Sequence, residues 1–179
     1  MSKMEIDSFI GVYGRDIYSF CCYLTKNRQE ADDLYQDSFV QILEKQEFPN
    51  DEECAKNMVL SAAVRIWKDK KRKFAWRRRI EEEKYIPMVI DDESEMTKDT
   101  PEEEMIKSEQ DAYIRKCVDA LPEKNRLVVL LYYMENLKIK EIAGVLKVPQ
   151  GTVKSRLHQA KAILSEKLKD YQNKEEHVL

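Results

Sequence analysis

The sequence predicts an all-α protein in which two small helical domains are joined by an acidic flexible linker. Apolar residues recur at helical spacing along most of the 179 residues, and only four Gly and five Pro interrupt them. Charge is segregated, so that an acidic block separates two basic ones. We expect an N-terminal helical bundle in residues 1–80, the linker in 81–102, a four-helix C-terminal domain in 103–170 and a disordered tail in 171–179.

Three helices account for the N-terminal bundle. The first has Asp7 or Ser8 as its expected cap, and the second follows Asn27, which with Glu30 resembles a capping box. The residues expected to face the core are Ile6, Ile10, Tyr13, Ile17, Phe20 and Leu24 in the first helix, and Ala31, Leu34, Ser38, Phe39 and Ile42 in the second.

The third helix is long, and its second half is strongly basic. Asn50 with Glu53 starts it, and its apolar stripe is formed by Ala55, Met58, Val59, Ala62 and Ile66. From residue 65 to 79 nine cations accompany a single acid, with Trp67, Phe74 and Trp76 among them. Cations attract phosphates, and exposed aromatic rings can stack on unpaired bases. The alternative places Trp67 in the core, which we favour for this residue, with the other two rings covering the core's edge.

The linker and the second domain differ in composition. Thirteen acids and three lysines lie between residues 81 and 111, and the first part of this segment has no apolar period, as in flexible, self-repelling linkers. A helix is expected near Glu103–Ala120. Pro122 is expected in the first turn of the next helix, which runs through Met134.

A helix-turn-helix from Leu137 to Leu164 is the most informative pattern in the chain. Two apolar stripes are expected to face inward: Ile139, Ile142, Ala143 and Leu146, then Val153, Leu157, Ala160 and Leu164. The exposed flank of the second helix then carries Lys154, Ser155, Arg156, His158, Gln159 and Lys161. Such a helix fits the major groove of DNA, where it can contact bases and phosphates. The alternative is an ordinary helical hairpin with a solvated face.

The second helix carries an acidic cluster, Asp32, Asp33, Gln36 and Asp37. Asp33 and Asp37 are one turn apart and share a face, which suits docking on a basic groove of a partner protein. Paired carboxylates also bind magnesium, as in all-helical prenyl-diphosphate synthases, but that chemistry needs a second aspartate-rich helix and more helices than this chain has. The four cysteines lack metal-ligand spacing. We therefore expect no catalytic residue, metal site or cofactor.

Two segments resemble the extracytoplasmic-function class of the sigma-70 family, small bacterial sigma factors with two helical domains and a short linker. They are ADDLYQDSF at Ala31–Phe39 and ALPEKNRLVVLLYYMENLKIKEIAGVLKVPQGTVKSRLHQAKAIL at Ala120–Leu164. The resemblance covers about Ser8 to Leu168, and GTVKSRL after an EIA helix is its most specific part. Where relatives usually show a tryptophan and an Arg–Asn pair, this chain has Asn57 and Ala63–Val64, so the family's contacts to an extruded −10 base do not carry over.

The resemblance implies a non-enzymatic factor that binds core RNA polymerase and directs initiation at promoter DNA. The acidic helix would dock on the clamp helices of the β′ subunit through Asp32, Asp33, Gln36 and Asp37. The third helix would recognise and help to open the −10 element through Lys68, Lys70, Lys71, Arg72 and Lys73. The C-terminal domain would touch the β flap and read the −35 element through Lys154, Ser155, Arg156, His158, Gln159 and Lys161. An anti-sigma factor is a further partner that the resemblance implies.

The residues of the recognition helix differ in their expected roles. Lys154 and Lys161 suit phosphates, whereas Arg156 or Gln159 suits a base edge, with an ion pair between Arg156 and Glu141 as the structural alternative. The rival function is a helix-turn-helix regulator that binds duplex DNA alone, which would normally carry a ligand, receiver or dimerisation domain. No apolar run could span a bilayer and the N-terminus lacks a signal-peptide core, so we expect a cytoplasmic protein without membrane insertion.

Overall fold

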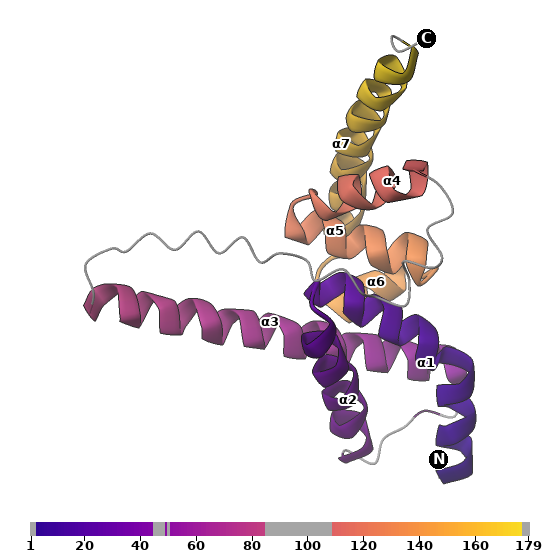
Figure 1. Cartoon of the computed structure of the whole chain (residues 1–179). Coiled ribbons are helices and arrows are strands. Elements are labelled where there is room, and N and C mark those ends of the chain that lie inside the picture. The colour runs from indigo at the N-terminus through magenta and orange to yellow at the C-terminus, as the bar shows by residue number, and fades with distance from the viewer. Residues whose placement is uncertain (1–2, 45–48, 50, 85–108, 177–179) are drawn as a thin grey trace. The chain divides into compact units, whose positions relative to one another are not determined.

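The computed structural model describes residues 3–44, 49, 51–84 and 109–176, and the regular structure within these ranges is helical throughout (Figure 1). The predicted all-α class is confirmed. The chain forms two compact units, Met1–Lys98 and Asp99–Leu179. Most of the expected linker lies outside the described residues. Within the described ranges, no helix is both long and apolar enough to cross a membrane.

The first unit consists of α1 (Lys3–Thr25), α2 (Arg28–Glu44) and α3 (Glu52–Lys84), which pack on one another. Its largest fully buried side chains are Ile17, Phe20, Leu24, Leu34, Val59, Leu60 and Val64. The expected stripe is wrong at Ile10, which is 37% exposed, whereas the neighbouring Phe9 is buried. Phe9 is 2% exposed and contacts Phe39 edge-on, with ring centroids 6.4 Å apart.

The expected caps of α1 and α2 have different outcomes. Helix α1 begins at Lys3, so the expectation that Asp7 or Ser8 caps it was wrong. Both residues lie inside the helix, because the residues that precede the apolar stripe also form helix. For α2 the expected cap is confirmed, since the N–H of Glu30 donates to Oδ1 of Asn27 at 3.0 Å.

The cap of α3 was missed by one position. Asn50, the expected cap, lies outside the described residues. Asp51 instead accepts a hydrogen bond from the N–H of Cys54 at 2.7 Å through its Oδ2. Hydrogen bonds from Cys54, first from its side chain and then from its backbone, lower the pKa of Asp51.

The second unit consists of α4 (Glu109–Asp119), α5 (Glu123–Val129), a π-helical turn η2 (Leu130–Met134), α6 (Ile139–Leu146) and α7 (Gln150–Glu176). Its core includes Val128, Leu131, Ile142, Val153 and Ala160, all fully buried. Pro122 is the N-cap of α5, so the expected first-turn position was off by one residue. The expected helix from Pro122 to Met134 is present, but its last turn is π-helical.

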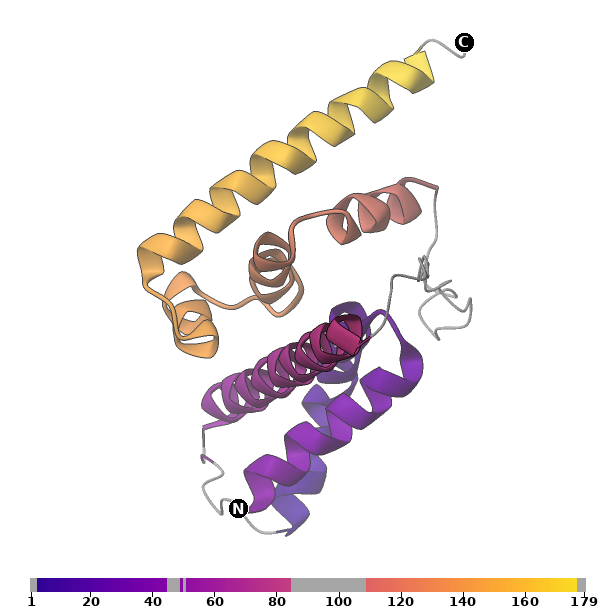
Figure 2. The ribbon, with the colours of Figure 1, turned by 90° about the vertical axis from the view of Figure 1, so that its left-hand side faces the viewer.

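Two helices continue past the expected domain ends. Helix α3 reaches Lys84 rather than residue 80, and α7 reaches Glu176, so the expectation of disorder was wrong for 171–176. Both extensions lack Gly and Pro and consist largely of good helix formers such as Glu, Lys and Gln. The far end of α7 runs beyond the other helices of its unit in both ribbon views (Figure 2).

Candidate nucleic-acid and partner interfaces

The acidic cluster of α2 lies on the exposed side of that helix, because Ala31, Leu34, Ser38 and Phe39 turn the opposite side into the core. All four expected residues, Asp32, Asp33, Gln36 and Asp37, are exposed. Asp32 accepts a hydrogen bond from the hydroxyl of Tyr18 on α1 at 2.7 Å. Burial, and then this hydrogen bond, raise the pKa of Tyr18, so the hydroxyl remains a donor at neutral pH.

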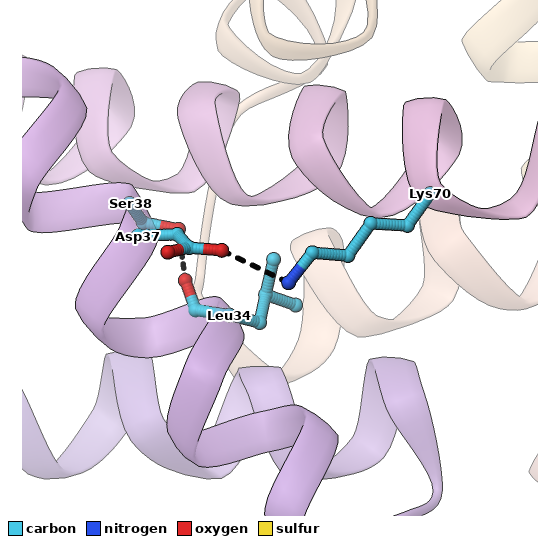
Figure 3. A network of polar contacts seen from close by, with 4 residues as sticks. All are labelled: Leu34, Asp37, Ser38 and Lys70. Carbon is cyan, nitrogen blue, oxygen red and sulfur yellow. Dashed lines mark hydrogen bonds and ion pairs between the residues drawn. The ribbon is translucent and has the colours of Figure 1, made fainter. Parts of the chain in front are cut away.

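Asp37 joins the acidic face to the basic helix. Its Oδ2 accepts a hydrogen bond from Nζ of Lys70 on α3 at 2.9 Å, and about half of each side chain is exposed (Figure 3). The neighbouring Ser38 is buried, and its hydroxyl donates to the carbonyl of Leu34 inside α2. An exposed pair of this kind contributes at most about 1 kcal/mol, so either side chain can exchange its partner for another charged group at low cost.

Sequence reasoning missed two apolar residues on the same side of α2. Val40 and Leu43 are 51% and 41% exposed. They follow Gln36 at four and seven residues, so they share its face of the helix. The sequence could have indicated this surface, because Val40 and Leu43 are apolar and lie outside the expected core stripe of the helix. The exposed side of α2 is therefore acidic in its first half and apolar in its second.

The five cations expected to meet −10 DNA are all exposed on the second half of α3: Lys68, Lys70, Lys71, Arg72 and Lys73. Arg72 pairs with Asp69 one turn earlier, at 3.1 Å. Nζ of Lys71 lies 4.9 Å from the ring centroid of Trp67. Trp67 is 6% exposed, so the core alternative is confirmed for this residue. The basic half of α3 is thus held at its start by the core and is solvent-exposed beyond it.

Phe74 and Trp76 do not cover the edge of the core. They are 64% and 65% exposed, so the alternative in which these two rings cover the core's edge was wrong. Both residues lie in the second half of α3, and the far part of this helix extends past α1 and α2 (Figure 1). Exposed aromatic rings within a basic helix are typical of nucleic-acid-binding surfaces.

The helix-turn-helix is formed by α6 and α7. Lys147 ends α6 in a left-handed conformation with φ of 54°, and the N–H of Val148 closes the turn on the carbonyl of Ala143 at 3.1 Å. The inward stripe of α7 is confirmed: Val153, Leu157 and Ala160 are buried and Leu164 is half-buried. Lys154, Ser155, His158, Gln159 and Lys161 are exposed, and Arg156 is half-buried.

Glu141 and Gln159 each have a hydrogen-bond partner that the sequence did not reveal. The carboxylate of Glu141 accepts a hydrogen bond from the N–H of Lys138 at 2.7 Å and caps α6, so the alternative that pairs Glu141 with Arg156 was wrong. Gln159 receives a hydrogen bond on its Oε1 from Nδ2 of Asn125 at 3.5 Å, which orients it from α5.

The titratable residues do not gather into a metal centre in the part of the chain that the structure describes: no three His, Cys, Asp or Glu side chains there could hold an ion. In the acidic cluster, Asp32 and Asp37 are engaged with Tyr18 and Lys70 instead. Of the cysteines, Cys21, Cys22 and Cys117 are buried thiols, whereas Cys54 is exposed.

Known proteins resemble this chain at three levels. Residues 111–164 match the family model described as sigma-70, region 4. The ECF RNA polymerase sigma factor SigW of Bacillus subtilis (strain 168) is 26% identical over 95% of this chain and 94% of its own length. The RNA polymerase sigma factor FliA of Escherichia coli (strain K12) is 36% identical over 41% of this chain and 29% of its own length.

A solved structure has the same fold. It is the sigma factor RpoE in complex with the anti-sigma factor NepR from Bartonella quintana, with a TM-score of 0.67 and 18% identity over 92% of this chain and 97% of that one. These similarities confirm the resemblance inferred from the sequence.

Proposed function

We propose, from the resemblance of the chain to extracytoplasmic-function sigma factors of the sigma-70 family, that it binds core RNA polymerase and directs initiation at specific promoters. The observation that carries the proposal is the presence of three charged surfaces among the described residues: the acidic face of α2, the basic half of α3 and the basic flank of α7. In a protein that binds DNA alone, the acidic and apolar face would have no use. In an initiation factor, this face of α2 would bind core RNA polymerase.

The polymerase surface is the exposed side of α2. Asp32, Asp33, Gln36 and Asp37 face a basic groove, for which the clamp helices of β′ are the expected site. Val40 and Leu43 extend this surface with apolar area, which the centre of a protein–protein interface requires. The charged part then determines orientation and association rate, while the apolar part adds affinity.

Two surfaces meet promoter DNA in this proposal. Lys68, Lys70, Lys71, Arg72 and Lys73 contact phosphates near the −10 element, where strand opening occurs. Lys154, Ser155, Arg156, His158, Gln159 and Lys161 contact the −35 element from the major groove. Lys154 and Lys161 supply phosphate contacts that position the helix, and Arg156 or Gln159 reads a base edge. An anti-sigma factor and the β flap are further proposed partners.

Run-off transcription tests the proposal. Core polymerase is combined with promoter fragments from a randomised library, with and without the purified chain. We expect transcripts from a small subset of fragments only when the chain is present. If the chain binds duplex DNA but yields no transcript with core polymerase from any fragment, the rival function as a stand-alone helix-turn-helix regulator is supported instead.

A charge reversal tests the polymerase surface. Replacing Asp33 by Lys removes an anion from the centre of the acidic face without breaking the Asp37–Lys70 pair, and we expect at least a tenfold loss of affinity for core polymerase. The matched control is Asp16→Lys, which makes the same charge change at an exposed position of α1. Equal affinity of the two variants, both with unchanged thermal unfolding, would contradict the assignment of this face.

A further inference from the structure

Tyr133 is an exposed aromatic residue beside the recognition helix for which the proposed contacts give no role. Its side chain is 53% exposed. Among the described residues of the second unit, only Tyr133 and Ile114 are large apolar residues with this degree of exposure. An aromatic ring that the fold leaves half in solvent, next to a DNA-reading helix, is a candidate for contact with the ligand.

The local backbone holds this ring in place. Tyr133 lies in the π-helical turn η2, a deviation from α-helix that is frequent at functional sites. The turn is closed by hydrogen bonds from the N–H of Glu135 to the carbonyl of Leu130 at 3.2 Å, and from the N–H of Leu137 to the carbonyl of Leu131 at 3.1 Å. Tyr132 packs against Tyr133 edge-on, with centroids 4.9 Å apart and an interplanar angle of 79°.

The ring contacts a cation of the recognition helix. Nζ of Lys161 lies 5.9 Å from the centroid of the Tyr133 ring, within the range of a cation–π contact. Lys161 follows Lys154 by seven residues and His158 by three, so all three share one exposed face of α7. The contact with Tyr133 therefore limits the positions that the Lys161 ammonium can take on the proposed DNA-binding face.

The surface continues from Tyr133 along the start of the helix-turn-helix. A groove there is lined by Tyr132, Tyr133, Asn136, Leu137, Lys138 and Ile139. Lys138 is exposed, and the groove lies between η2 and the start of α6. Two cations thus belong to this surface: Lys161, which contacts the Tyr133 ring, and Lys138, which lines the groove. Both are available to phosphates of a DNA strand.

We propose that Tyr133 is a further DNA-binding residue of the second unit. Its ring positions the Lys161 ammonium for a backbone phosphate, and its hydroxyl donates a hydrogen bond to a phosphate of the same strand. This inference rests on the proposed function, in which α7 binds the −35 duplex. Because the contact is to the backbone, it adds affinity without sequence preference.

Two substitutions separate the ring from the hydroxyl. In the full-length chain, Tyr133→Phe keeps the ring and removes the hydroxyl, whereas Tyr133→Leu removes both. We expect Tyr133→Leu to bind duplex DNA about two- to fivefold more weakly than Tyr133→Phe, equally on −35 and scrambled sequences, as loss of an exposed cation–π contact implies. In a Lys161→Ala background this difference should vanish, because the ring then has no cation to position.

The controls keep the outcomes distinct. Ile114→Ala changes the other exposed apolar residue of the unit and should bind DNA as the parent chain does. Tyr133→Leu binding as tightly as the parent, or a Phe–Leu difference that persists without Lys161, would overturn the inference. If Lys161→Ala itself leaves DNA affinity and its salt dependence unchanged, the proposed −35 surface is contradicted as well. If only the Tyr133 variants leave DNA affinity unchanged, the inference about Tyr133 is wrong and the proposed −35 surface is unaffected.

Discussion

At the scale of single residues, Gly14 has a role that its sequence position does not reveal. It is buried in α1, and a Cβ placed there would lie 2.9 Å from the hydroxyl oxygen of Tyr35. Tyr35 cannot move aside easily, because its ring packs between Tyr18 and Phe39, with centroids 5.7 Å and 4.9 Å away. The absence of a side chain at this position therefore sets how closely α1 and α2 approach.

A pair of glycine substitutions tests this. Gly11→Ala lies on the same helix, where a Cβ meets nothing within 4 Å, and we expect it to stabilise the first unit by up to about 1 kcal/mol through helix propensity. Gly14→Ala gains the same propensity but displaces Tyr35, and we expect it to be less stable than Gly11→Ala by about 1–3 kcal/mol. Thermal unfolding of the two variants measures the difference. Equal stabilities would mean that the α1–α2 contact relaxes without cost.

At the scale of helices, the start of α3 depends on one carboxylate. Asp51 accepts a hydrogen bond from the Cys54 N–H, and the bonds from Cys54 lower the pKa of Asp51. A lowered pKa means that the folded state prefers the charged carboxylate. The stabilisation is therefore present above the ordinary pKa of about 4 and is lost as the pH falls below it.

Substitution of this cap should thus be pH-dependent. We expect Asp51→Ala to lower the stability of the first unit at pH 7 and to have a progressively smaller effect as the pH falls from about 5 to about 2. Asn27→Ala provides the control, because its cap on α2 is a neutral amide with no titration in this range. Urea unfolding at several pH values distinguishes them. A constant effect of Asp51→Ala across this range would show that charge has no part in the cap.

Helical periodicity explains which features of these helices could be predicted from the sequence. The inward stripe of α7 followed from the spacing of Val153, Leu157 and Ala160, because a helix has one buried side. The exposure of Trp76 could not follow from spacing, since it depends on where α1 and α2 end in space. The engagement of Asp37 with Lys70 was likewise hidden, because the two residues are 33 positions apart and belong to surfaces that sequence reasoning treated separately.

At the scale of the whole molecule, the two units have separate cores. The first core is formed by residues such as Phe20 and Leu34, and the second by residues such as Leu131 and Ile142. Each unit buries its own apolar side chains and can therefore unfold as a cooperative unit.

This separation predicts two unfolding transitions in calorimetry of the full chain. Gly14→Ala should shift only one of them, and duplex DNA carrying the −35 element should raise only the other, because ligand binding stabilises the unit that binds. A single transition that both changes shift together would mean that the units fold as one body.

The contrast between the two tryptophans has a practical consequence. Trp67 is 6% exposed under Lys71, and Trp76, nine residues later on the same helix, is 65% exposed. Their emission spectra should differ, with that of Trp67 shifted to the blue and inaccessible to iodide. In Trp76→Phe, the emission of Trp67 reports the unfolding of the core of the first unit. In Trp67→Phe, the emission of Trp76 reports the binding of a ligand to the basic half of α3. The natural sequence thus carries two intrinsic fluorophores, one for folding and one for recognition.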